Sequence, residues 1–389
     1  MQTLFRNVKL VADEKIIDGA LLVRDGAIAA LGERLDAPEA KVIDGRGLYL
    51  SPGFCDLHVH GGGGFSAMDD DPGKIVKMAE AHLGHGVTSI LPTTLAAPIS
   101  RLQEAISAIT CAKRLSPAAR ILGVHLEGPF LSPKRAGAQS PGDLAVPDRE
   151  KIEALLDFSK DVRMIGAAPE IPGGFLVGEM AERRGITASV AHSDAAFEVA
   201  EAALDHGYSD ITHIFSASSA MHKEGLFRQV GVAEAGLALD GFTAQFIGDL
   251  RHLPYGAVKL IYRCKGADKA YLISDGLEFA GCDCPEGTVV TQENGQKAVI
   301  EDGVMKLFDR SCLAGSVTTL DRMVKNLLTC GIPLWDAVKM ASATPLKVIG
   351  LGDRRGRLAP GYDADLVLFD EDIGIKAVYV GGKEVLINS

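Results

Sequence analysis

The chain has 389 residues with a formal net charge of −11 and 47% hydrophobic residues, which is long enough for one barrel-sized domain together with a small one. The negative charge argues against a nucleic-acid or anionic-membrane surface, and no apolar run approaches the roughly 20 residues that a membrane helix needs. Seven cysteines without a CxxC pair argue against a zinc ribbon or a disulfide framework, so we expect a protein of the reducing cytoplasm.

The two ends of the chain carry β patterns. Residues 1 to about 50 contain short apolar runs and tight turns, and the dipeptide at 25–26 is the Asp-Gly hairpin signal. The same kind of pattern returns after residue 351, with apolar runs at 366–369 and 377–380. We therefore expect residues 1–51 and 352–389 to pair into one small β-sandwich domain.

Between residues 52 and 351, short apolar strands alternate with helical stretches. This order predicts an α/β fold, a (β/α)8 TIM-like barrel of a metal-dependent hydrolase, in which functional residues gather at the C-terminal ends of the strands. The eight strands are expected at residues 51–60, 86–94, 121–127, 164–169, 186–192, 210–213, 242–247 and 271–274.

The first of these strands ends in the sequence His-Val-His followed by four glycines. Because side chains alternate between the faces of a strand, His58 and His60 are expected to point the same way and could present ligands to a metal. Candidate ligands recur at later strand ends. These are Glu127, His192, His213 and Asp275. Since the strand ends of a barrel meet at one mouth, we expect all six residues to converge there.

Two histidines and one glutamate with an open position form the donor set of many hydrolytic zinc sites. We expect Glu127, His192 and His213 to hold a metal, with His58 and His60 able to add a second ion. A metal would lower the pKa of a bound water to roughly 7. Asp275 is expected to be the catalytic general base, which then passes the proton to the leaving amine. The donor types leave the metal open among zinc, iron and other divalent ions.

Six motifs occur in order along the predicted barrel: HVHGGGG, GVHLEGPFLSPKRAGAQ, AHSDA, THIFSA, ISDG and LAGS. Together they resemble the N-acetylglucosamine-6-phosphate deacetylases of the amidohydrolase superfamily. The resemblance implies metal-dependent hydrolysis of an acetamido group to give an amino sugar phosphate and acetate. It assigns Glu127, His192 and His213 as metal ligands and Asp275 as the acid/base. Some members keep the HxH pair and hold two metals, so one or two ions are possible here.

The resemblance also implies a homodimer in which basic side chains bind the substrate phosphate, partly from the neighbouring subunit. In the matching block at 221–228, Lys223 stands where an arginine is usual, and Arg228 is a second basic candidate. His252 follows Asp-Leu where the family usually has Asp-Gly. Further substrate-binding residues are expected at Gln139, Ser216, Ala217, Leu313 and Ala314. These departures leave the gluco, galacto or manno configuration of the sugar open.

Other functions remain open at this point. A dihydroorotase or hydantoinase would generally use a carbamylated lysine at the end of the fourth strand, and residues 163–170 contain no lysine. A deacetylase for another or an unphosphorylated amino sugar remains an alternative. A deacylase for an N-acyl amino acid is opposed only weakly by the basic residues Lys223, Arg228 and Arg251. A non-catalytic paralogue would be expected to have lost ligands, and none is lost.

Overall fold

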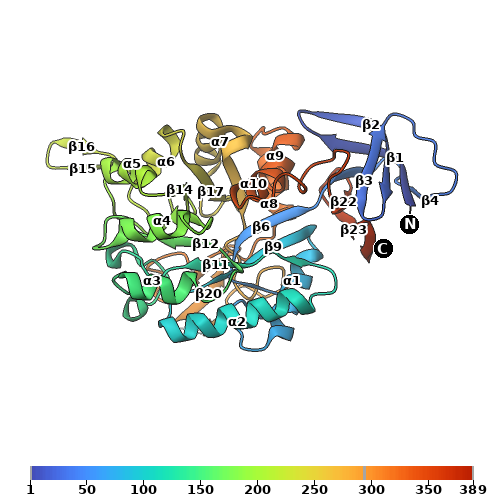
Figure 1. Ribbon diagram of the computed structural model, residues 1–389. Coiled ribbons are helices and arrows are strands. Elements are labelled where there is room, and N and C mark those ends of the chain that lie inside the picture. Colours follow the sequence, from blue (N-terminus) through green and yellow to red (C-terminus); the bar gives the residue numbers. More distant parts are fainter. Residues whose placement is uncertain (1, 292–294, 388–389) are drawn as a thin grey trace.

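The computed structural model describes residues 2–291 and 295–387, and it places a barrel beside a sheet that contains both ends of the chain (Figure 1). Within these residues, eight parallel strands make the barrel wall. They are β6 (Phe54–Val59), β9 (Val87–Thr94), β11 (Val124–Glu127), β12 (Val162–Ala167), β13 (Thr187–Val190), β14 (Tyr208–Ile211), β17 (Thr243–Ile247) and β18 (Ala270–Ile273). The predicted α/β barrel is confirmed.

The barrel closes where its first and last strands meet. The main-chain N–H of Asp275 donates to the carbonyl of His58 at 2.9 Å, and the N–H of His60 donates to the carbonyl of Gly276 at 2.8 Å. Strands β6 and β9 are buried at every position, as expected for parallel strands that are covered on both faces. Closure therefore brings the HxH pair beside the residue that follows the last strand.

Helices surround the barrel and bury one apolar face each. They are α1 (Pro72–Leu83), α2 (Ile99–Leu115), α3 (Arg149–Leu156), α4 (Gly174–Glu182), α5 (Phe197–Asp205), α6 (Val232–Ala238), α7 (Tyr255–Lys269), α8 (Leu320–Thr329), α9 (Leu334–Met340) and α10 (Ala343–Val348). Helix α1 begins with a side-chain cap, because Asp71 accepts a hydrogen bond from the N–H of Gly73 and Pro72 occupies the first turn. No helix in the described ranges is long and apolar enough to span a bilayer.

The second sheet combines strands from the two ends of the chain. Its members are β1 (Gln2–Ala12), β2 (Lys15–Arg24), β3 (Ala27–Gly32), β4 (Lys41–Asp44), β5 (Tyr49–Pro52), β22 (Leu366–Phe369), β23 (Ile375–Val380) and β24 (Lys383–Ile387). Strand β5 pairs antiparallel with β22, and Phe5 packs edge-on against Tyr379 with ring centroids 4.9 Å apart. The predicted β region from both termini is confirmed; residues 1, 388 and 389 lie outside the described residues.

Shorter elements lie in the loops. They are β7 (Gly61–Gly62), β8 (Phe65–Ser66), β10 (Arg120–Ile121), the 3-10 turns Pro133–Arg135 and Pro141–Asp143, the hairpin β15 (His222–Glu224) and β16 (Phe227–Gln229), and the sheet β19 (Val289–Thr291), β20 (Lys297–Glu301) and β21 (Val304–Leu307). The hairpin projects away from the barrel (Figure 1). The small sheet packs Met305 and Ile300 against Ala314, so it supports the loop that follows the last barrel strand.

Candidate metal centre and active site

The candidate ligands lie where barrel strands end. Glu127 is the last residue of β11, whereas His192, His213 and Asp275 each lie two residues beyond the ends of β13, β14 and β18. These last three residues have positive φ angles of 44°, 23° and 47°. Positive φ is uncommon outside glycine and is concentrated at functional sites, where the surrounding structure enforces it. The chain thus turns sharply at three strand ends, and the three side chains line one cavity.

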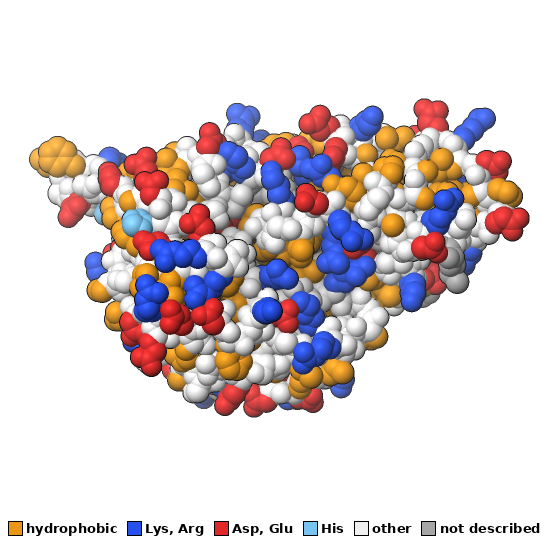
Figure 2. Space-filling view, viewed as in Figure 1, with side chains coloured by type: hydrophobic (Ala, Val, Ile, Leu, Met, Phe, Trp, Pro, Cys, Tyr) orange, Lys and Arg blue, Asp and Glu red, His pale blue; other side chains and the backbone are white. Residues whose placement is uncertain are grey.

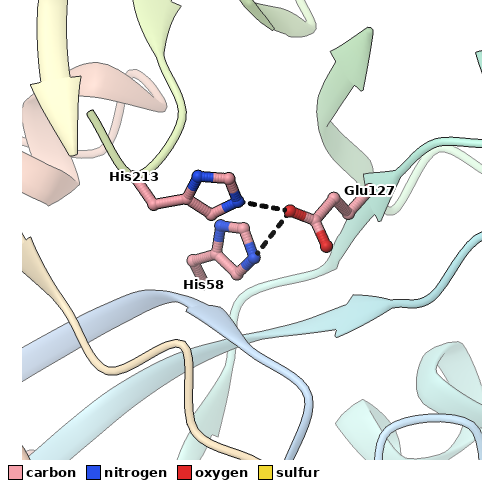
Figure 3. Close-up of side chains that lie close together, drawn as sticks. All are labelled: His58, Glu127 and His213. Atoms are coloured by element: carbon pink, nitrogen blue, oxygen red, sulfur yellow. Dashed lines mark hydrogen bonds and ion pairs between the residues drawn. The ribbon is translucent and has the colours of Figure 1, made fainter. Parts of the chain in front are cut away.

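The carboxylate of Glu127 lies at the centre of the cluster. Its Oε1 is 3.0 Å from Nε2 of His213 and 3.3 Å from Nε2 of both His58 and His192. Its Oε2 is 3.3 Å from Nε2 of His60. Figure 3 shows His58 and His213 meeting the same carboxylate oxygen. Four imidazoles from the ends of three strands, β6, β13 and β14, therefore converge on one buried carboxylate.

Asp275 joins the cluster through the HxH pair. Its Oδ1 lies 3.2 Å from Nε2 of His60 and 3.5 Å from Nε2 of His58. The cluster contains two groups of three residues whose donor atoms all lie within 4.8 Å of one another. One group is His58, Glu127 and His213, and the other is His58, His60 and Asp275. Imidazole nitrogens and carboxylate oxygens at this spacing fit a divalent transition metal.

Each imidazole of the cluster also makes a hydrogen bond through its other nitrogen. Nδ1 of His60 lies 3.0 Å from the carbonyl of Thr93, and Nδ1 of His192 lies 2.8 Å from the carbonyl of Arg135. Nδ1 of His213 lies 3.1 Å from the carbonyl of Ser216, and Nδ1 of His58 lies 3.0 Å from Oε1 of Gln245. A carbonyl oxygen can only accept, so the three carbonyl-bound rings donate from Nδ1. When such a ring is neutral, its Nε2 carries the lone pair that a metal ion needs.

The imidazoles and carboxylates of the cluster stabilise each other's charged forms. Burial alone would lower the pKa of His60, but hydrogen bonds to Asp275 and Glu127 outweigh it and raise that pKa to about 10. Burial alone would raise the pKa of Asp275, yet the neighbouring imidazoles of His60 and His58 lower it to about 2. Both carboxylates are therefore anions that lie beside protonated imidazoles, and a bound cation would take the place of the imidazole protons.

A cavity of about 320 Å³ opens directly onto the cluster. Most of the predicted substrate-binding residues line it, namely Gln139, Ser216, Ala217, His252, Leu313 and Ala314. Apolar wall residues that the sequence analysis did not single out are Leu95, Phe215, Leu277 and Cys312. Phe215 belongs to the Thr-His-Ile-Phe motif that carried the resemblance, so that motif could have identified it. Leu95 and Leu277 carry no comparable signal.

Two of the predicted substrate-binding residues are fixed by neighbours. Gln139 is buried, and its amide donates to Oε2 of Glu127 at 2.6 Å and accepts from the N–H of Ala96 at 2.8 Å. The side chain therefore orients the central carboxylate from the cavity wall. His252 is held through Nδ1, which lies 2.7 Å from Oδ2 of Asp249. Its Nε2 edge thus remains available on the cavity side of this pair.

The predicted phosphate-binding residues Lys223 and Arg228 lie outside the cavity of their own chain. They face each other across the hairpin of β15 and β16, and both are exposed. Neither lines the cavity within the chain. The tip of this hairpin is apolar, since Leu226 is 85% exposed and Phe227 is 74% exposed. Figure 2 shows hydrophobic side chains at the end of this projection.

Comparison with known proteins places the whole chain in one group. Residues 49–385 match the amidohydrolase family. The chain is 32% identical over 366 residues to N-acetylglucosamine-6-phosphate deacetylase of Lysinibacillus sphaericus, covering 93% of this chain and 92% of that protein. It is 29% identical over 388 residues to N-acetylgalactosamine-6-phosphate deacetylase of Escherichia coli O157:H7, covering 98% of this chain and 99% of that protein.

A solved structure agrees with this assignment. The crystal structure of N-acetylglucosamine-6-phosphate deacetylase from Pasteurella multocida matches with a TM-score of 0.92 and 28% identity, over 100% of both chains. The family match, the fold and the strand-end cluster of histidines and carboxylates agree. The chain therefore belongs to the amidohydrolase family, and within it to the relatives of N-acetylglucosamine-6-phosphate deacetylase.

Proposed function

We propose that this protein is a metal-dependent deacetylase that hydrolyses the acetamido group of N-acetylglucosamine 6-phosphate to glucosamine 6-phosphate and acetate. The observation that carries the proposal is the convergence of four imidazoles and two carboxylates at the mouth of a barrel, beside a cavity of about 320 Å³. The 32% identity to the Lysinibacillus sphaericus enzyme supports the choice of substrate.

Each residue of the site has a separate role in the proposed reaction. Glu127, His192 and His213 would hold a divalent metal, zinc or iron, and His58 and His60 could hold a second ion. Such a metal would polarise the amide carbonyl and lower the pKa of water. Gln139 holds the carboxylate of Glu127 in place. Asp275 takes a proton from the attacking water and gives it to the departing amine nitrogen. Leu313 and Ala314 face the cavity and fit the methyl group of the acetyl moiety.

Among the described residues of one subunit, no lysine or arginine lines the cavity, and His252 is the lining imidazole outside the metal cluster. We propose that the protein is a homodimer and that Lys223 and Arg228 reach the phosphate in the active site of the neighbouring subunit. The exposed apolar tip of the hairpin, with Leu226 and Phe227, supports this arrangement because a partner would cover it. We also propose a cytoplasmic enzyme with residues 52–351 as the hydrolase domain and residues 1–51 and 352–389 as the β domain.

Acetate release from a panel of acetylated amino sugars tests the proposal. The panel contains N-acetylglucosamine and N-acetylgalactosamine, each with and without the 6-phosphate, and metal content is measured on the same samples. We expect N-acetylglucosamine 6-phosphate to be hydrolysed much faster than the free sugar. N-acetylgalactosamine 6-phosphate is the second candidate substrate, because the Escherichia coli relative covers 98% of this chain. Equal rates with and without phosphate would contradict the phosphate site.

A further inference from the structure

One imidazole of the metal cluster is oriented differently from the other three. His60, His192 and His213 direct Nδ1 to main-chain carbonyl oxygens, whereas His58 directs Nδ1 to a side chain, Oε1 of Gln245, at 3.0 Å. His58 and Gln245 are both completely buried, and Gln245 lies in β17, which is separated from β6 by β18 in the closed barrel. The tautomer of His58 therefore depends on the orientation of the side-chain amide of Gln245.

A buried aspartate fixes the direction of that amide. Nε2 of Gln245 donates to Oδ2 of Asp210 at 2.7 Å. The carboxylate of Asp210 also accepts hydrogen bonds from three hydroxyl groups, those of Ser189 at 2.9 Å, Thr243 at 2.5 Å and Tyr271 at 3.2 Å. An ionised carboxylate only accepts, so the NH₂ group of Gln245 faces Asp210 and its carbonyl oxygen faces His58.

The same reasoning then fixes the ring of His58. A carbonyl oxygen opposite Nδ1 requires the hydrogen on Nδ1, so in the neutral ring, the form that binds a metal ion, the lone pair lies on Nε2. That lone pair lies 3.3 Å from Oε1 of Glu127 and 3.2 Å from Nε2 of His60. If the amide were reversed, the hydrogen would lie on Nε2 and would block metal ligation by His58.

We infer that Gln245, turned by Asp210, is a positioning residue that keeps Nε2 of His58 unprotonated and so makes the HxH pair able to bind a metal ion. The inference rests on the proposed metal-dependent function, but it concerns residues of the barrel interior that the cavity does not expose. Residues that orient metal ligands in this way typically change metal affinity by 10- to 100-fold when they are replaced.

Substitution of Gln245 tests the inference on the whole protein. Gln245→Met keeps the volume of the buried side chain but removes the acceptor opposite His58. Gln245→Glu restores an acceptor, because a carboxyl group accepts from Nδ1 in either protonation state. Thr243→Val is the matched control, since it removes the hydrogen bond to the other oxygen of Asp210 and does not touch Gln245.

Two measurements report on these variants. The first is the ¹⁵N NMR spectrum of metal-free protein labelled at histidine, recorded at alkaline pH; the His58→Gln variant assigns the signals. The second is zinc affinity by competition with a chelator. We expect the wild type, Gln245→Glu and Thr243→Val to carry the hydrogen on Nδ1. We expect Gln245→Met to shift it toward Nε2 and to weaken zinc binding at the HxH pair by about 10- to 100-fold.

The outcomes separate this inference from the proposed function. Wild-type His58 with its hydrogen on Nε2, or a Gln245→Met variant that matches the wild type in both tautomer and zinc affinity, would overturn the inference. If Thr243→Val also lost the Nδ1 hydrogen of His58 and the wild-type zinc affinity, the inference would be overturned as well, because altered packing of β17 would then explain both losses. Failure of acetate release by wild-type protein would instead overturn the proposed function and leave the tautomer measurement intact.

Discussion

Asp275 and His60 face each other where the last strand of the barrel meets the first, with Oδ1 3.2 Å from Nε2. Main-chain hydrogen bonds across the same junction, from Asp275 to His58 and from His60 to Gly276, hold the two residues in register. The carboxylate thus lies beside the HxH pair of imidazoles rather than apart from the cluster. Its position is compatible with proton transfer and with metal ligation, and a substitution distinguishes these roles.

Asp275→Asn is expected to abolish turnover without releasing the metal. The amide keeps the size of the side chain but cannot take a proton from water, so kcat should fall by about 100-fold or more. Metal content of the purified variant and kcat on N-acetylglucosamine 6-phosphate are the measurements. Asp157→Asn is the control, because that exposed carboxylate pairs with Arg184 at 2.6 Å and does not belong to the cluster or the cavity. Loss of metal together with activity in Asp275→Asn would make Asp275 a ligand.

The hairpin of β15 and β16 offers a test of the proposed homodimer. Serine at both Leu226 and Phe227 removes an apolar tip whose side chains are 85% and 74% exposed in the single chain. We expect this double variant to be monomeric by light scattering and to have a raised KM for the phosphorylated sugar. Leu115→Ser is the control, since Leu115 is 59% exposed at the end of α2, away from the hairpin. A wild-type protein that is itself monomeric would contradict the proposal.

The basic residues of the hairpin have a separate expected effect. If Lys223 and Arg228 bind the substrate phosphate of a neighbouring subunit, alanine at either position should raise KM for N-acetylglucosamine 6-phosphate and leave the mass of the assembly unchanged. The rate with the unphosphorylated sugar should not change, because that substrate offers no anion to bind. Steady-state kinetics with both sugars measure the difference. A parallel loss with both substrates would instead indicate a role in folding or assembly.

The sequence predicts the convergence of ligands but not the groups that orient them. Alternation along one strand places His58 and His60 on one face, and strand order places Glu127 at the same mouth. These patterns are local, so they can be recognised without coordinates. Gln245 and Asp210 act on His58 from other strands, and their partners depend on the register of the closed barrel. The small sheet after β18 was not predicted, because its strands are short and interrupt the β/α alternation.

A partly buried ion pair joins the terminal sheet to the barrel. Arg120 donates to both oxygens of Asp365, at 2.7 and 2.9 Å, and Asp365 is 7% exposed. Arg120→Met should lower the free energy of unfolding by about 1–3 kcal/mol, because the buried carboxylate loses its cation. Urea denaturation measures the change. Arg6→Met is the control: Arg6 pairs with Asp44 at 3.8 Å on the surface, where such pairs contribute about 0–1 kcal/mol. Equal effects of the two substitutions would contradict the prediction.

Lys265 in α7 should make stability depend on pH in alkaline solution. Burial lowers the pKa of its amine from 10.5 to about 8, while the amine donates to the carbonyl of Leu239 at 2.8 Å. Between pH 8 and 10.5 the unfolded chain binds a proton that the folded chain does not, so the free energy of unfolding rises with pH. The lowered pKa corresponds to a loss of at most about 3 kcal/mol in the free energy of unfolding at neutral pH.

Lys265→Met should therefore be more stable than the wild type at pH 7, and this advantage should shrink as the pH rises toward 10. The carbonyl of Leu239 also accepts from the N–H of Phe242 at 3.3 Å, so the substitution does not leave it unpaired. Lys265→Arg remains charged across the whole range and should be destabilised at every pH. Urea denaturation at pH 7, 8, 9 and 10 gives the three curves. Parallel curves for the wild type and Lys265→Met would show that the amine does not titrate on folding.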